Sequence, residues 1–296
     1  MFLVFEIAVY LLAMLCLWHA CVRGWAQVGM LLAGMIYGLF FEYMAIETFH
    51  AYRYGSFLIM LFDAVPLCIG VSWGMIIYTA MATSDRFALP WYLRPVLDAL
   101  LALQIDLSMD AIAIRMGFWR WATPGPWFGV PLGNFYAWFV VVFGFSLMVR
   151  LGCVWRTAGR GNFLANVIVA AVTVPLSVVG CIALLRPYAS VLLQGTVGWS
   201  ITGMLVIGSS LLALWAARRT RRDHELDLLA VSVAMFFHVF FFAGLLWNGI
   251  IWQVPLLVPI SASVATAGLL LHLWPSWNWF RWHVVARVAP ATSHMS

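Results

Sequence analysis

The chain has 296 residues, of which 65% are hydrophobic and 9% are charged, and its mean hydropathy is +0.97. These values exclude a soluble globular domain of this length. The formal net charge of +5 arises from 16 basic residues that are all arginine. We interpret this charge as a sign of membrane topology and of contact with lipid headgroups, and we expect no nucleic-acid partner.

Apolar segments of about 20 residues, the length needed to cross a bilayer, follow one another along the whole chain. We expect nine transmembrane helices, with eight or ten left open, at about 2–21, 26–46, 57–82, 92–115, 134–151, 163–185, 195–216, 226–247 and 250–274. The sequence therefore predicts an all-α, polytopic integral membrane bundle. Residues 1–288 would form its single domain, and residues 289–296 would be a disordered C-terminal tail.

The arginines are unevenly distributed when successive loops are assigned to alternate sides of the membrane. Twelve fall on one side and four on the other, the four being Arg53, Arg115, Arg120 and Arg186. By the positive-inside rule, the side with more arginines is cytoplasmic. We therefore expect the N-terminus outside and the C-terminus in the cytoplasm.

Five carboxylates inside the apolar segments stand out: Glu42, Asp63, Asp98, Asp106 and Asp110. A charged side chain in the hydrocarbon region costs at least ~2.5–3.5 kcal/mol, so such residues usually face a protein interior and mark function. For any one of them, a hydrogen bond between two helices is the structural alternative. Asp98 follows Arg94 by one helical turn, and an ion pair between these two residues would account for it.

We expect the other four carboxylates to share one depth near the outer surface. At a rise of 1.5 Å per residue, Glu42 would lie ~6 Å below the outer end of its helix and Asp63 ~9 Å below that of the next. Asp110 and Asp106 would lie ~8 and ~14 Å below the end of the fourth helix, on one face because they are four residues apart. Two carboxyl groups held close together in a dry site do not both ionise easily. One of them would keep its proton and could act as a general acid.

Gly34, Gly38 and Glu42 follow one another at spacings of four on the second predicted helix. Glycines at this spacing allow a neighbouring helix to approach closely. Packing explains the glycines themselves, and we expect it to press the face that carries Glu42 against the partner helix.

Residues 117–138, after the fourth predicted helix, combine many aromatic side chains with proline and glycine. Aromatic belts are common at membrane interfaces, but a belt does not require the Pro and Gly residues that fix the shape of a loop. A belt also does not explain Asn134, at the start of the fifth predicted helix. We therefore expect a rigid aromatic lid over a carboxylate pocket. Because aromatic faces stabilise cations, this combination suits a reaction that passes through a carbocation.

Metal chemistry is not expected from this sequence. Its seven histidines lack the close pairs with which membrane di-iron enzymes bind iron. The single Asp-x-x-x-Asp pair, Asp106 and Asp110, is fewer than the two aspartate-rich motifs that prenyl-transferring enzymes normally use to hold magnesium and diphosphate. We expect neither a metal nor an organic cofactor.

Two runs in the predicted lid are distinctive: Gly117-Phe-Trp119-Arg-Trp121, and Trp127-Phe-Gly-Val-Pro-Leu-Gly-Asn134-Phe-Tyr-Ala-Trp138. With the upstream acids Asp106, Asp110 and Glu42, and with Tyr52-Arg-Tyr54, they resemble the signature of the carotenoid biosynthesis membrane-protein family. That family includes hydratases of bacterioruberin and myxol-type pathways. The resemblance covers about residues 34–150. It departs at Ala111, where the family often has proline, and at residues 48–52, which replace a glycine-rich stretch.

The resemblance implies a hydro-lyase that hydrates the terminal double bond of an acyclic carotenoid end group. Asp110 or Asp106 would protonate the alkene, with Glu42 and Asp63 as supporting catalytic carboxylates. The implied substrate-binding residues are Asn134, Trp119, Trp121, Tyr54, Trp127 and Tyr136. The implied partners are a lipophilic polyene and the lipids of a bacterial or archaeal cell membrane. A homo-oligomer, or a complex with other pathway enzymes, is left open.

Three other functions stay open. A cofactor-free carotenoid cyclase or isomerase would begin with the same protonation and end in ring closure or proton loss. A proton-coupled transporter or lipid-binding membrane protein would use the acids as a relay, but we find no repeat of the kind expected for transporters. A non-catalytic subunit of a pathway complex would be inactive when purified alone.

Overall fold

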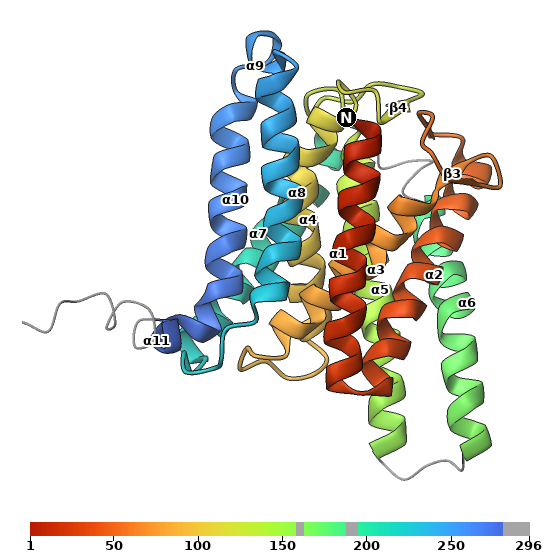
Figure 1. Ribbon diagram of the computed structural model, residues 1–296, viewed down its shortest axis with the longest axis vertical. Coiled ribbons are helices and arrows are strands. Elements are labelled where there is room, and N and C mark those ends of the chain that lie inside the picture. Colours follow the sequence, from red (N-terminus) through yellow and green to blue (C-terminus); the bar gives the residue numbers. More distant parts are fainter. Residues whose placement is uncertain (158–162, 188–194, 281–296) are drawn as a thin grey trace, which may run out of the picture.

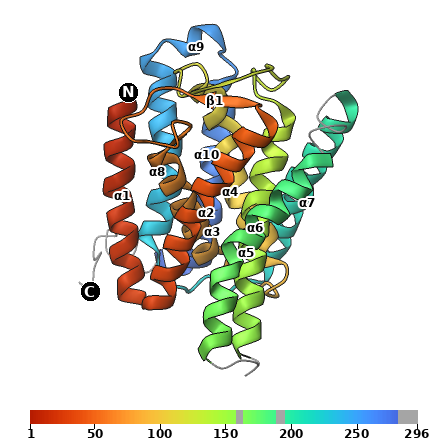
Figure 2. The ribbon, with the colours of Figure 1, turned by 90° about the vertical axis from the view of Figure 1, so that its right-hand side faces the viewer.

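Long helices run up and down through the protein and form one bundle, as the computed structural model shows (Figures 1 and 2). The structure describes residues 1–157, 163–187 and 195–280. Within these residues the long helices are α1 (Phe2–Arg23), α2 (Trp25–Phe49), α3 (Leu67–Ser84), α4 (Arg94–Ala113), α5 (Leu132–Thr157), α6 (Phe163–Pro187), α7 (Gly195–Arg219), α8 (Leu228–Trp247) and α10 (Leu257–Leu273). Each corresponds to one predicted segment.

Seven apolar segments among the described residues are long enough to cross a membrane, and they contain α1, α2, α3, α5, α7, α8 and α10. The outward face of α1 is typical of a lipid-facing surface, with Leu3, Ile7 and Leu11 exposed. The charged helix α4 lies at the centre, where α3, α5, α7, α8 and α10 pack against it. The predicted all-α polytopic membrane bundle is confirmed.

Two glycines bring α2 against α3. A Cβ atom at Gly34 would lie 3.1 Å from the Cα of Gly74, and one at Gly38 would collide with the side chain of Trp73. The expected close approach of α2 to a partner helix is therefore confirmed, and α3 is that partner. On the same face of α2, one turn further on, Glu42 is buried.

Short strands and turns cover one end of the bundle. Strand β1 (Tyr52–Tyr54) pairs in antiparallel fashion with β4 (Trp119–Trp121), so that Tyr52 lies opposite Trp121 and Tyr54 opposite Trp119. Strands β2 (Met60–Leu61) and β3 (Val65–Pro66) form a smaller ladder just before α3. The ribbon of β1 and β4 spans the ends of α2 and α4 (Figures 1 and 2).

The third predicted helix begins ten residues too early. It was expected at 57–82, but α3 begins at Leu67, directly after Pro66. A proline disfavours helical geometry in the residue before it, so Val65 is extended and belongs to β3. Asp63 therefore lies in the β2–β3 turn, with a φ of 53°, and its side chain is exposed. The expectation that Asp63 lies inside the membrane at the depth of the other acids is wrong.

A buried carboxylate that the sequence analysis overlooked fixes this turn-containing segment. Glu6 of α1 is 1% exposed, and its Oε2 accepts a hydrogen bond from the backbone N–H of Leu58 over 2.7 Å. Its Oε1 accepts another from the N–H of Ile59 over 3.3 Å. Glu6 thus satisfies backbone donors in a segment whose own ladder is only two residues long.

The last predicted segment, 250–274, is divided. A single turn, α9 (Ile250–Gln253), precedes α10, and Pro255 lies between them. Proline cannot donate the helical backbone hydrogen bond at its position, which accounts for the break. After α10, the 3₁₀ turn η2 (Trp274–Ser276) and the single-turn helix α11 (Trp277–Phe280) complete the described chain.

The ion pair expected between Arg94 and Asp98 does not form. Asp98 is fully buried and binds Arg150 of α5 over 3.0 Å and the hydroxyl of Ser146 over 2.5 Å. Arg94 instead pairs with Asp85 over 2.9 Å, near the surface. The side chain of Asp98 thus points towards α5 in the interior of the bundle and not along α4 towards Arg94. Asp98 therefore links α4 to α5, and it does not line the cavity of the acid cluster.

The two ends of the described chain lie at opposite ends of the bundle. Helix α1 begins at the end that carries β1 and β4, whereas α11 lies at the other end (Figure 1). The assignment of the first of these ends to the outside of the cell stays a prediction. The expected boundary between a membrane domain and a tail, at residues 288 and 289, lies outside the described residues.

Candidate active site

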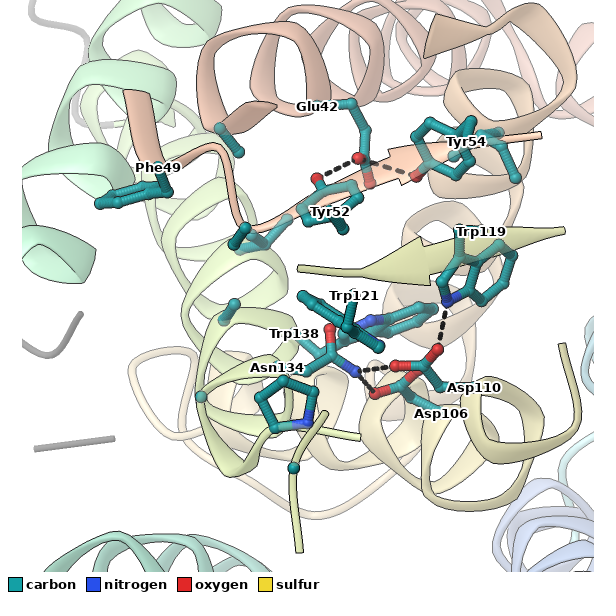
Figure 3. Close-up of a pocket in the computed structure, with 18 of the residues that line it drawn as sticks. Glu42, Phe49, Tyr52, Tyr54, Asp106, Asp110, Trp119, Trp121, Asn134 and Trp138 are labelled. Carbon is teal, nitrogen blue, oxygen red and sulfur yellow. Dashed lines mark hydrogen bonds between the residues drawn. The ribbon is translucent and has the colours of Figure 1, made fainter. Parts of the chain in front are cut away.

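A cavity of about 1090 Å³ lies under the β1–β4 ribbon. Its walls come from α2, α3, α4 and the start of α5, and both strands of the ribbon roof it (Figure 3). The carboxylates that line it are Glu42, Asp106 and Asp110. The sequence-based expectation that these three acids share a cavity beneath an aromatic lid agrees with this geometry.

Asp106 and Asp110 form a pair on α4. They are 0% and 1% exposed, and their positions four residues apart place them on one helix face. The amide nitrogen of Asn134, in the first turn of α5, donates to Oδ2 of Asp106 over 2.6 Å and to Oδ2 of Asp110 over 2.7 Å. The indole N–H of Trp119 donates to the other oxygen of Asp110. One amide thus joins two buried carboxyl groups (Figure 3).

Glu42 is held on the facing wall by three donors. The hydroxyl groups of Tyr52 and Tyr54 donate to its Oε2 over 2.5 and 2.8 Å. The indole N–H of Trp73 donates to its Oε1 over 2.7 Å. Hydrogen bonds of this kind favour the ionised form of a carboxyl group. Donors thus occupy both oxygens of Glu42, and none of these donors is shared with the paired acids across the cavity.

The alternation of the ribbon explains why its aromatic residues face the acids. Successive side chains of a strand point to opposite faces, so Tyr52 and Tyr54 point one way and Arg53 the other. The ring centroids of Tyr52 and Trp121 are 5.0 Å apart, and those of Tyr54 and Trp119 are 5.9 Å apart.

The ionisation of the two tyrosines follows from the same arrangement. Burial raises the pKa of Tyr52 and of Tyr54 well above the usual value, and the neighbouring Glu42 raises both further. Both hydroxyl groups therefore keep their protons and act as donors.

The remaining wall is aromatic and apolar. Trp73 and Trp138 stack with their ring centroids 4.3 Å apart. Among the described lining residues, His50 is the one basic side chain, so the cavity has no arginine to hold a diphosphate. Over the described part of the chain, no group of three or more His, Cys, Asp and Glu side chains is arranged to hold a metal ion. The arrangement combines an acid pair, a separate carboxyl group and aromatic faces.

The structure brings together most of the predicted site residues but not all of them. Glu42, Asp106, Asp110, Asn134, Trp119, Trp121 and Tyr54 line the cavity. Asp63, Trp127 and Tyr136 do not. Trp127 packs outside the cavity against Phe128 and Phe135, and its indole N–H donates to the carbonyl of Leu107 over 2.9 Å.

Three residues that line the cavity were not among the predicted site residues: Tyr52, Trp73 and Trp138. The signal for Tyr52 was available, because in a strand it shares a face with Tyr54. Trp138 lies inside the lid motif, but nothing in the sequence distinguishes it from the other aromatic residues there. Trp73 carries no local signal, since its role depends on the packing of α3 against Gly38 of α2.

The chain was compared with known protein families, with curated proteins and with solved structures. Residues 1–193 match the family described as carotenoid biosynthesis protein. The match includes every carboxylate, tyrosine and tryptophan named at the cavity. No curated protein and no solved structure matches. This integral membrane protein therefore belongs to the carotenoid biosynthesis protein family.

Proposed function

We propose that this protein is a carotenoid hydratase, which adds water to the terminal double bond of an acyclic carotenoid end group and forms a tertiary alcohol. The observation that carries the proposal is the carboxyl pair Asp106 and Asp110, joined through Asn134 inside an aromatic cavity. The family match supports a role in carotenoid biosynthesis. The choice of hydration rests on the chemistry of these side chains.

The acid pair supplies the proton. Two buried carboxyl groups that share one amide donor do not both ionise readily, so the pair retains a proton at neutral pH. Asp106 or Asp110 transfers this proton to the less substituted alkene carbon, where a C–H bond forms as the π bond breaks. The electron deficiency then lies on the neighbouring tertiary carbon. General acid catalysis of this type typically contributes a factor of about 10²–10⁴.

The aromatic faces stabilise the cation. A cation over the face of Trp or Tyr gains about 2 kcal/mol or more when the site is desolvated. Trp119, Trp121 and Tyr54 surround the acid pair, and the bond from Trp119 to Asp110 fixes one ring relative to the proton donor. The polyene itself would extend from this end group along the apolar part of the cavity.

Glu42 completes the reaction as the base. Water attacks the tertiary carbon, a C–O bond forms, and Glu42 accepts the proton that the water loses. Return of that proton to the acid pair restores the starting state. One alkene and one water are consumed for each alcohol, so the reaction involves no oxidant or reductant.

We also propose that the lid faces the outside of a bacterial or archaeal cell membrane. Support comes from the distribution of arginine, which is sparse on the side where α1 begins and where Arg53, Arg115 and Arg120 lie. The end group of the membrane-dissolved polyene would then reach the cavity from the outer half of the bilayer.

The proposal is tested by producing the protein in cells that make lycopene, and by growing them in ¹⁸O-labelled water. We expect a product with one added water and the label in its hydroxyl group. Asp110→Asn should abolish most conversion, whereas Asp63→Asn, in the exposed turn, should retain it. A product of unchanged mass would indicate cyclisation or isomerisation and overturn hydration. No product from well-folded protein would favour a non-catalytic or transport role.

A further inference from the structure

Three of the four arginines predicted on the outer side gather around the lid: Arg53, Arg115 and Arg120. Arg53 and Arg120 lie directly opposite each other in the β1–β4 ladder. Both are exposed, and the strand alternation places them on the face of the ribbon opposite to that of Tyr52 and Trp121. The ribbon therefore has an aromatic inner face over the acids and a cationic outer face.

This pairing is unfavourable without a counterion. Like charges directly opposite in a two-stranded ladder are destabilising. Within the described chain, the carboxylates that form salt bridges are Asp85, Asp98 and Asp227, and none of them binds an arginine of the lid. An external anion would remove the repulsion.

A hollow of about 270 Å³ lies beside β4 and has two of the arginines in its wall. Arg115 and Arg120 line it, together with Trp119, Trp121 and Phe128. Arg115 is fixed there, because its Nη1 donates to the carbonyls of Ala111 and Phe128 over 2.6 and 2.7 Å. Partial burial lowers the pKa of Arg115. A bound anion would offset that burial.

We propose that this hollow binds the phosphate of an anionic phospholipid, held by Arg115 and Arg120, with Arg53 adding to the positive field. Guanidinium groups bind phosphate with paired hydrogen bonds. We favour a lipid over a soluble anion because the ribbon lies at one end of the bundle of membrane-spanning helices (Figure 1). Lipid headgroups meet a membrane protein at the ends of such helices.

The site has a consequence for the cavity beneath it. Trp119 and Trp121 line both the hollow and the acid cavity, so they form the wall between the two. A lipid that fixes this wall would also fix the indole that donates to Asp110. The binding site itself does not depend on the proposed hydration.

The test compares thermal unfolding in nanodiscs of phosphatidylcholine with and without phosphatidylglycerol. Phosphatidylglycerol should raise the unfolding temperature of the natural protein by about 2–4 °C, the shift expected for about 1 kcal/mol. Arg120→Gln should lose most of this rise. In phosphatidylcholine alone, the same variant should be as stable as the natural protein or more so, because the repulsion with Arg53 is gone. A variant that loses the rise with phosphatidylglycerol but is no less stable in phosphatidylcholine alone must be folded.

Arg218→Gln is the matched control. It removes an exposed arginine at the far end of α7 and should keep the full rise. Arg53→Gln should show the same reversal as Arg120→Gln, to a smaller extent. If Arg120→Gln and Arg218→Gln lost the same part of the rise in unfolding temperature, the rise would depend only on the total charge of the protein, and the proposed site would be overturned. A rise produced by inorganic phosphate in phosphatidylcholine nanodiscs would overturn the lipid as its source.

Discussion

The indole N–H of Trp73 donates to the carboxylate of Glu42 over 2.7 Å, across the interface between α2 and α3. The same indole side chain occupies the space that a Cβ atom at position 38 would need. The orientation of the Glu42 carboxyl group therefore depends on how closely these two membrane helices approach.

Gly38→Ala should impair activity without touching an acid. The added methyl group must displace Trp73, and this displacement should lengthen or break its bond to Glu42. We expect a loss of at least tenfold in turnover, measured as alcohol formed per folded protein. Gly29→Ala is the control, because it lies in the same helix with open space around its Cβ position. Equal activity of the two variants would contradict this link between packing and the site.

Asp106→Asn and Asp110→Asn should each lower turnover by about 10²–10⁴, the range typical of a lost general acid. Each leaves one carboxyl group that no longer shares its proton with a partner. The double variant should be little worse than either single one, because the two residues act as a unit. Turnover rates of purified proteins in detergent would measure this. Additive losses would indicate two independent roles.

Glu42→Gln should change the product as well as the rate. Without a base for the attacking water, the cation should more often lose a proton and give an isomerised alkene. The fraction of alcohol among all products, measured by chromatography, should fall. Tyr52→Phe should cause a smaller change, since Tyr54 and Trp73 still hold the carboxylate. An unaltered alcohol fraction in Glu42→Gln would remove Glu42 from the mechanism.

Arg150→Gln should destabilise the protein by about 3–5 kcal/mol, the usual cost of leaving a buried charge without its partner. The stranded residue is Asp98, which is fully buried. Arg94→Gln should cost at most about 1 kcal/mol, because its pair with Asp85 is solvent-exposed. Unfolding in mixed micelles would measure both. Asp98→Asn should restore much of the stability lost in Arg150→Gln, and its failure to do so would assign the loss to other contacts of Arg150.

The sequence predicted the helices and the acids because both have strong physical signatures. A long apolar run fits a membrane span, and a charged side chain inside such a run is costly. Both features stand out in a sequence, so Glu42, Asp106 and Asp110 could be found without a structure. The position of Asp63 was predicted wrongly because the apolar run continues through Pro66, and hydropathy alone ignores the geometry that a proline imposes. The partner of Asp98 was misassigned because Arg94 is near in sequence, whereas Arg150 is near only in space.

Contacts between distant segments account for the rest. Nothing local to Trp73 or Glu6 indicates what they bind, since their partners are 31 and more than 50 residues away. The pairing of β1 with β4 was also out of reach, because two three-residue strands carry too little pattern to identify each other. Their facing aromatic residues could be guessed individually, but their register could not.

The ribbon also determines when the site can exist during synthesis. Strand β1 leaves the ribosome early, but its partner β4 follows only after α3 and α4 have been made. At about 5–20 residues per second, Tyr52 and Tyr54 wait several seconds for that partner. Asn134 arrives later still. No nascent chain shorter than 134 residues can close the roof and join the two aspartates, so the acids are inserted into the membrane before the chemistry that they serve is possible.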